Sequence, residues 1–327
     1  MQVLLARAAR RLVSAVALVL LVISISFAMI HAAPGDAALV LAGEAGGADM
    51  TTLEHVRRAF GLDRPLVEQF LNHLGRTARG DLGYSYLFNR PVSDLIAERM
   101  GPTLALTLCA LVPSVLLGVV LGISAARRPG STLEMLITSL SVAGLAMPVF
   151  WMGIVLMIVF GAVIPIAPVG GMRDVTLAAT GLSGLLDRLH HLMLPALTLA
   201  LVNLGLFSRL VHASLRQTLD SDFIRTARSY GLPERVILYR HALRHALMPL
   251  VSAIGVRFSA LLSGAVLVEA VFSWPGLGDL ALDAIMGRDT PTLLGLLVCG
   301  SLVTILVNVL CDLILAGIDP RLRTTLA

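Results

Sequence analysis

Residues 220–250 have the sequence DSDFIRTARSYGLPERVILYRHALRHALMPL, and the fold of the chain can be worked out from them. Five arginines and two histidines surround one Gly-Leu-Pro at residues 231–233, and a long apolar run lies on either side of the stretch. Glycine commonly ends helices and proline begins them, and Glu234 then falls in the first turn of the next helix, where an acidic side chain is favoured. The stretch therefore predicts an elbow of two helices joined at Gly231, set between two apolar helices.

The composition of the whole chain agrees with membrane helices on both sides of this elbow. Of 327 residues, 57% are hydrophobic and 14% are charged, and the mean hydropathy is +0.86. Soluble proteins carry about 25% charged residues, so the chain is predicted to be a polytopic membrane protein. The net charge of +4 is too small for a protein that coats nucleic acid, and the cysteines at 109, 299 and 311 lie in apolar runs and are interpreted as packing residues.

Apolar runs of about 20 residues are long enough to cross a bilayer. Six such runs are predicted as spans: 12–30, 103–126, 134–164, 192–211, 246–268 and 293–316. The first is too long for a signal-peptide core of about 7–15 residues, so it is expected to be a retained helix. In the third, Pro148 is expected to kink the helix, which should end near Ile164.

Arginine placement favours six spans with both termini in the cytoplasm. This topology puts 14 arginines in cytoplasmic segments and three in short outer loops, as expected when positive charge stays inside. The predicted fold class is therefore an all-α polytopic membrane protein with a helical extracytoplasmic insertion between helices 1 and 2. The expected domains are an N-terminal helix (1–31), the outer helical region (32–102), a five-helix core (103–318) with a cytoplasmic loop (212–245), and a tail (319–327).

The outer region shows apolar residues at helical spacing. They are Leu53, Val56, Phe60, Leu66, Phe70 and Leu74. One or two amphipathic helices are expected here, ending at Gly61 and Gly80. Packing on the rim of the bundle is the favoured role for them, and docking of an extracytoplasmic partner is the alternative.

Two interpretations of the elbow stay open on its pattern alone. Small residues near the bend, Thr226, Ala227 and Ser229, would permit close approach to a groove on another protein, and arginines would supply paired contacts. Attraction of the arginines to anionic lipid, worth about 1 kcal/mol each, explains the charge but not the Gly-Pro break.

The elbow resembles the cytoplasmic loop of ABC importer permeases, whose consensus is Glu-Ala-Ala, three residues, Gly, nine residues, Ile-x-Leu-Pro. Ala227, Gly231 and Leu243 match this consensus, while its Glu, first Ala, Ile and Pro are replaced. The replacements resemble the dipeptide/oligopeptide/nickel branch of that family. Stretches along nearly the whole chain agree with the same branch: HAAPGDAA, GLDRPLVEQF, RGDLGYSY, RPVSDLIAERMGPTLAL, MPVFWMG, HLMLPALTLAL, VEAVFSWPGLGDLALDAIMGRDTP and DPRLR.

This resemblance implies a multi-pass permease subunit in the inner membrane of a prokaryote. It would pair with a homologous second permease, and two cytoplasmic ATPase subunits would drive the pair. An external binding protein would deliver di- or oligopeptides to it. The alternative substrate is nickel or another small solute. The chain itself would be non-catalytic and bind no cofactor, with ATP and Mg on the ATPases. The residues that would couple to the ATPase are Asp222, Arg225, Thr226, Ala227, Gly231, Leu232 and Glu234.

Arg257 can be identified as a candidate functional residue from its position in the sequence, without the family resemblance. It lies eleven residues into the fifth span, about 16 Å deep at 1.5 Å per residue. A charge facing lipid at that depth would be costly, so Arg257 is expected to face the bundle interior and to contact a substrate carboxylate or carbonyl, or to serve as a gate residue. The alternative is an internal ion pair or a tether between helices, with Asp312 as the candidate acidic partner.

Other candidate residues are less specific. Met147, Pro148 and Asn203 join Arg257 as the predicted translocation path, although hydrogen bonding between helices is the favoured interpretation of Asn203 and Asn308. Trp274 suits an interfacial anchor, and the family places Trp274, Pro275 and Gly276 at an outer gate. No metal site is predicted, because the adjacent His190 and His191 would point about 100° apart on a helix.

Two other classes of protein agree less well with the sequence. An intramembrane enzyme would need paired aspartates, a Ser–His pair or an HExxH motif within the spans, and the sequence contains none of them. A self-contained carrier or channel would commonly show internal repeats and several ionisable groups in the membrane, whereas only Arg257 lies deep.

Overall fold

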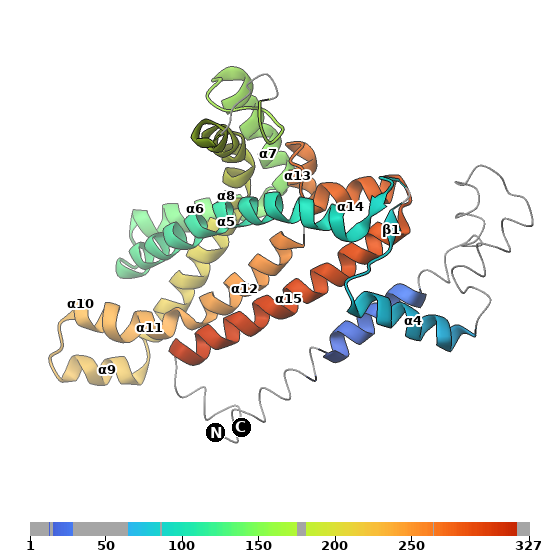
Figure 1. Cartoon of the computed structure of the whole chain (residues 1–327). Helices are drawn as coiled ribbons and strands as arrows, with labels where there is room; N and C mark the ends of the chain where they lie inside the picture. The colour runs from blue at the N-terminus through green and yellow to red at the C-terminus, as the bar shows by residue number, and fades with distance from the viewer. Residues whose placement is uncertain are drawn as a thin grey trace, which may run out of the picture. The chain divides into compact units, whose positions relative to one another are not determined.

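The computed structural model describes residue 13 and residues 16–28, 65–85, 87–174, 181–263 and 265–318, with side chains up to Ile314. The described chain is nearly all helical (Figure 1). Its one sheet pairs two-residue strands, β1 (Tyr84–Ser85) and β2 (Arg90–Pro91), in antiparallel register. The all-α prediction therefore holds except for this short ladder.

The helices follow one another along the chain with short connections. Their bounds are α4 (Leu66–Ala78), α5 (Val92–Arg127), α6 (Thr132–Ala146), α7 (Val149–Met157), the π-helix η1 (Ile158–Val163), α8 (Gly181–Leu219), α9 (Asp222–Ser229), α10 (Glu234–Val236), the π-helix η2 (Ile237–Ala242), α11 (Leu243–Ala246), α12 (Met248–Leu262), α13 (Val266–Val271), α14 (Leu277–Met286) and α15 (Thr290–Ile318). A shorter apolar helix covers Val16–Ala28.

Among the described residues, three helices are long and apolar enough to cross a membrane: Val92–Arg127, Gly181–Leu219 and Thr290–Ile314. Two bent pairs of helices bring the number to five if each pair is one span. The predicted second, fourth and sixth spans are therefore confirmed as continuous helices, and each begins several residues before its predicted start. The predicted first span coincides with the short helix Val16–Ala28, so the count of six stays a prediction.

The third span is broken and not merely kinked, which corrects the expectation at Pro148. The axes of Thr132–Ala146 and Val149–Val163 meet at 101°. Met147 (ψ 134°) and Pro148 (ψ 133°) are both extended, because the proline ring disfavours helical backbone at the residue before it. The helical path still ends beside Ile164, as predicted.

The fifth span also differs from its predicted limits. Helices Glu234–Ala246 and Met248–Leu262 meet at 43°, and the chain leaves the helix after Leu262, six residues before the predicted end. Ala265 (ψ 57°) separates α12 from the short helix α13. The apolar run continues to residue 268, but it serves a packed turn there and not a longer span.

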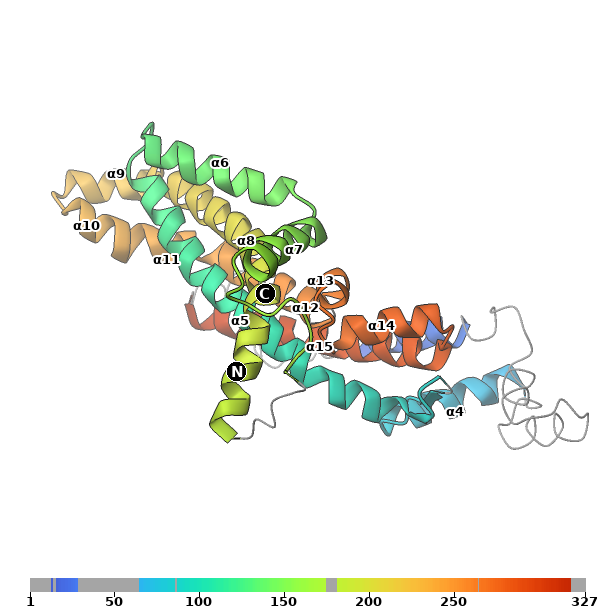
Figure 2. The ribbon, with the colours of Figure 1, turned by 90° about the horizontal axis from the view of Figure 1, so that it is seen from above.

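The chain divides into two compact units. Unit 1 comprises residues 1–99 and 280–303, and unit 2 comprises residues 100–279 and 304–327. In unit 2, α6 and α7 both pack on α8, as the view from above shows (Figure 2). Gly118 and Gly122 of α5 permit close approach to α8, because a Cβ at either would lie 2.8 or 2.7 Å from the Cβ of Phe207 or Val211.

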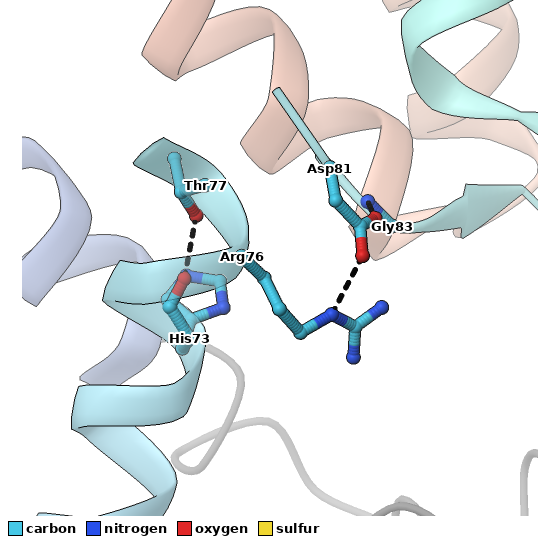
Figure 3. A network of polar contacts seen from close by, with 5 residues as sticks. All are labelled: His73, Arg76, Thr77, Asp81 and Gly83. Carbon is cyan, nitrogen blue, oxygen red and sulfur yellow. Dashed lines mark hydrogen bonds and ion pairs between the residues drawn. The ribbon is translucent and has the colours of Figure 1, made fainter. Parts of the chain in front are cut away.

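In unit 1, the predicted amphipathic helix is confirmed as α4, whereas the part of the prediction before residue 65 lies outside the described residues. Phe70 of α4 stacks edge-on against Phe27, with ring centroids 5.4 Å apart. Gly80 (φ +82°) ends the turn after α4, as expected. Asp81 then accepts hydrogen bonds from Arg76 Nε (2.7 Å) and from the Gly83 amide (3.0 Å) (Figure 3), and the Arg76 guanidinium lowers the pKa of the Asp81 carboxyl.

Candidate functional site

The elbow is formed by local hydrogen bonds at Gly231. The Gly231 amide donates to the Arg228 carbonyl at 2.9 Å, and the Leu232 amide donates to the Ala227 carbonyl at 3.4 Å. This pattern, with a left-handed glycine (φ +73°), is a Schellman motif that ends α9. No atom lies within 4 Å of a Cβ built on Gly231, so the glycine is needed for its backbone angle and not for space.

The elbow differs from the prediction at its beginning. The sequence placed its one bend at Gly231, whereas the structure has a further bend before it, because α8 ends at Leu219 and α9 starts at Asp222. Asp220 and Ser221 form the turn between them, so the elbow has two bends. The two arms project beyond the ends of α8 and α12 (Figure 1).

Two ion pairs stabilise the elbow on its surface. Arg225 contacts Asp222 at 3.4 Å within α9. Arg228 joins the two arms across Gly231, because its Nε and Nη2 donate to the two oxygens of Glu234 at 2.7 and 3.4 Å. The sequence analysis did not single out Arg228, although its position three residues before Gly231, with Glu234 three residues after it, could have indicated this pair.

A small apolar cluster supports the elbow from inside. Ile224 of α9 and Ile237 of η2 are both 0% exposed and pack with Leu215 at the end of α8. Ala227 packs against the same cluster and is half-buried. The other predicted coupling residues are exposed: Asp222, Arg225, Thr226, Gly231, Leu232 and Glu234. Tyr230, which the sequence analysis did not name, is 81% exposed at the tip.

The predicted path residues do not share one environment. Met147 and Pro148 are exposed at the break in the third span, and Arg257 is half-buried on α12. Asn203 is 3% exposed, and its Nδ2 donates to the Leu199 carbonyl of its own helix at 2.8 Å. Its Oδ1 has no hydrogen-bond partner among the described residues, so the expected bond to a neighbouring helix is not formed.

Arg257 does not pair with Asp312, the partner that the sequence suggested. A Cβ at Gly255 would lie 2.4 Å from Cys311 Sγ, so this face of α12 lies against α15. Arg257 follows two residues later and projects roughly 200° further round the helix, away from α15. Within the part of the chain that is described, no hydrogen bond or ion pair reaches its guanidinium.

The predicted outer-gate residues lie in a packed turn between α13 and α14. Trp274 is 1% exposed, and its Nε1 donates to the Pro102 carbonyl at 3.1 Å. The indole is therefore a buried packing group and not the interfacial anchor that was expected. Gly276 is buried and Pro275 is half-buried, and a gate-lining role for the turn stays a prediction.

The adjacent histidines do not converge on one point. His190 Nε2 lies 2.8 Å from the Ile166 carbonyl, and His191 Nδ1 lies 2.9 Å from the Asp187 carbonyl. Their rings are 6.4 Å apart and inclined at 78°. Each ring is held by a different backbone group, in line with the angle expected for neighbours on a helix.

Comparison with known proteins places the chain in a family. Residues 118–324 match the "Binding-protein-dependent transport system inner membrane component" family, and residues 4–107 match the N-terminal part of such membrane components. The glutathione transport system permease protein GsiC of Pectobacterium atrosepticum is 36% identical over 314 residues, which cover 96% of this chain and 97% of GsiC. GsiC of Escherichia coli K12 is 35% identical over the same shares of the two chains.

A solved structure shows the same fold. One chain of the MetNI methionine ABC transporter, in inward-facing conformations, is similar with a TM-score of 0.53 and 19% identity. The similarity covers 69% of this chain and 96% of that chain. Together with the family match over more than half of the sequence, these likenesses establish that the chain belongs to the binding-protein-dependent inner membrane components, as an ABC importer permease of the peptide family.

Proposed function

We propose that this permease forms one half of a translocation path for di- and oligopeptides in the cell membrane of a prokaryote. A homologous second permease supplies the other half, an extracytoplasmic binding protein delivers the peptide, and two cytoplasmic ATPases bind ATP and Mg and drive transport. The chain spans the membrane six times with both termini inside. The GsiC relatives, named for transport of glutathione, support a peptide substrate.

The elbow carries this proposal. Its exposed surface includes Asp222, Arg225 and Thr226 along α9, while the Schellman motif and the Arg228–Glu234 pair fix the angle between its arms. A short rigid helix of this kind suits insertion into a groove on another protein. ATP-driven closure of the ATPases then moves the permeases between inward- and outward-facing states, and the elbow must be stiff to transmit that movement.

A surface substitution tests the coupling role without disturbing the fold. Arg225→Glu combined with Thr226→Arg changes only exposed side chains, whereas Ala227→Arg would also disrupt the supporting cluster. We expect the double variant to lose copurification with coexpressed ATPase and to lower peptide uptake at least about tenfold, equivalent to ~1.4 kcal/mol. Arg128→Glu, in an exposed loop outside the elbow, is the matched control. Unchanged ATPase binding in the double variant would refute the coupling role.

We further propose that Arg257 contacts the carboxylate of the passing peptide. It is half-buried, lies within a membrane span and has no acidic partner among the described residues, and such a residue commonly marks a substrate pathway. Uptake of a dipeptide and of its C-terminal amide separates this role from a structural one. The wild type should prefer the free acid, Arg257→Gln should lose the preference, and Arg257→Lys should keep part of it. Equal preference in wild type and Arg257→Gln would exclude the contact.

A further inference from the structure

α13 carries a buried carboxylate, beside the turn to α14, that the proposed transport role does not use. Glu269 is 0% exposed. Its Oε1 accepts the Thr103 hydroxyl at 2.9 Å, and its Oε2 accepts the amides of Gly278 and Asp279 at 2.7 and 3.0 Å. These amides belong to the first turn of α14, where free N–H groups favour an anion. The carboxylate therefore holds α13, α14 and α5 together.

Two glycines give this carboxylate its space. A Cβ on Gly276 would lie 2.4 Å from the carboxylate atoms of Glu269, and a Cβ on Gly278 would lie 2.7 Å from the Val266 backbone and 2.9 Å from Glu269 Oε2. Neither glycine has a positive φ. Close packing, and not backbone freedom, is therefore the reason for glycine at both positions of the Pro-Gly-Leu-Gly segment: Gly276 leaves room for the Glu269 carboxylate, and Gly278 leaves room for the Val266 backbone and for that carboxylate.

Thr103 completes the connection from the side of α5. It is 0% exposed, and its hydroxyl oxygen accepts the Leu277 amide at 2.7 Å while donating its proton to Glu269. One hydroxyl group thus links α5 to both the acid and the start of α14. The bond from Trp274 to the Pro102 carbonyl adds a second connection one residue away on α5.

The same turn is also fixed to the loop between the third and fourth spans. The Gly171 amide donates to the Phe272 carbonyl at 2.8 Å, and the Phe272 ring is 1% exposed. Ser273 follows with φ 47°, a left-handed angle that a non-glycine residue keeps only where its surroundings hold it. Burial raises the pKa of the Glu269 carboxyl, while the amides and the Thr103 hydroxyl act against that rise. Because burial removes the Glu269 carboxylate from water, the carboxylate needs all of its hydrogen-bond donors to be stable at this position.

We propose that Glu269 is a positioning residue that fixes the α13–α14 turn to the adjoining part of α5, so that turn and helix move as one rigid body during the transport cycle. The inference rests on the proposed function, since it concerns movement in that cycle. In the proposed topology the turn lies on the extracytoplasmic side. A rigid link here would make α5 follow any displacement that the binding protein imposes on the turn.

Spin labels test the rigid link directly. Leu267 on α13 and Leu117 on α5 are 57% and 54% exposed, and both can be replaced by labelled cysteine after the three native cysteines are changed to serine. In the assembled complex we expect one narrow distance distribution, the same with and without trapped ATP. Glu269→Gln and Thr103→Val should broaden it, Thr103→Ser should restore it, and Glu98→Gln, which removes an exposed carboxylate, should leave it narrow. A wild-type distance that changes between the two states, or a narrow distribution in both Glu269→Gln and Thr103→Val, would overturn the proposal.

Transport measurements separate this inference from the proposed function. Glu269→Gln and Thr103→Val should each lower uptake at least tenfold, leave basal ATPase activity within twofold, and abolish its stimulation by loaded binding protein. The Glu269→Gln/Thr103→Val double variant should lower uptake no further than Glu269→Gln alone, because the two side chains act as one unit. If the wild-type complex transports no peptide but the spin-label distances are as expected, the proposed substrate is wrong and the rigid link between the turn and α5 is supported. If Glu269→Gln does not assemble, the comparison of Thr103→Val with Thr103→Ser decides.

Discussion

The elbow at Gly231 and the turn at residues 272–278 both reverse the chain between helices, but they do so by opposite means. The elbow lies at the surface, uses glycine for its backbone angle, and has open space around that glycine. The turn lies in the interior, uses glycines for room, and places its left-handed angle on Ser273 instead. The elbow keeps its shape mainly by local bonds, which leaves a face free for a partner. The turn keeps its shape by bonds to distant segments, which makes it part of the bundle.

The largest expected effect is at the acid of the turn. Glu269→Ala leaves two amides and one hydroxyl group buried without their acceptor, at about 1–3 kcal/mol for each unsatisfied group. We expect a loss of at least about 3 kcal/mol on this basis, measured by thermal unfolding of the purified permease. Glu234→Ala at the elbow is the matched removal of an exposed acid, and it should change stability by less than about 1 kcal/mol. Similar losses for the two variants would mean that the contrast between the regions is wrong.

Alanine substitutions at Gly276 and Gly231 should distinguish a glycine that is needed for space from a glycine that is needed for its backbone angle. Gly276→Ala forces a methyl group against the carboxylate of Glu269, and such overpacking costs about 1–3 kcal/mol. Gly231→Ala meets no atom but must hold a left-handed angle, at roughly 1–2 kcal/mol. The two pairs of sites should also differ in additivity. The Glu269→Ala/Gly276→Ala double variant should lose less stability than the sum of its two single variants, because the methyl group and the carboxylate compete for one space, whereas the losses of Glu234→Ala and Gly231→Ala should add.

The smallest expected effect is the ion pair of the elbow. Arg228 and Glu234 are 44% and 68% exposed, and such pairs contribute about 0.2–1 kcal/mol and weaken as salt is added. A double-mutant cycle of Arg228→Gln and Glu234→Gln, read by hydrogen exchange of the α9 amides, should give a coupling of this size at low salt. The coupling should shrink at 1 M salt. An interaction above about 2 kcal/mol would indicate that the pair is shielded from solvent, unlike the surface pairs on which the estimate rests.

The sequence was informative where the cause of a structure is local. Gly231 and Pro233 end one helix and begin the next through their own backbone chemistry, so the bend could be placed to the residue. Pro148 could be recognised as the site of a kink for the same reason. The angle of 101° could not, because it depends on how α6 and α7 each pack on α8.

Contacts between residues that are far apart in the chain could not be predicted from one sequence. Thr103 and Glu269 are 166 residues apart, and no spacing rule connects them. Glu269 did give a signal, as the one acid in the apolar run VLVEAVF, but the predicted fifth span ended one residue before it and no role was assigned to it. Arg257 was singled out by its predicted depth, and its role stays a prediction. Its orientation away from Asp312 follows from the close approach of Gly255 to Cys311, which only the packed helices reveal.

The π-helix η2 gives the elbow an unequal tolerance to changes in length. A π-turn holds one more residue than an α-turn over nearly the same rise, so one residue deleted within Ile237–Ala242 can be absorbed when the backbone rewinds to an α-helix. A residue deleted from α9 has no such reserve, and it would rotate the remainder of that helix by about 100° relative to Gly231. Length variants of this loop are therefore expected to accumulate on the returning arm and to be excluded from the arm that carries Arg225.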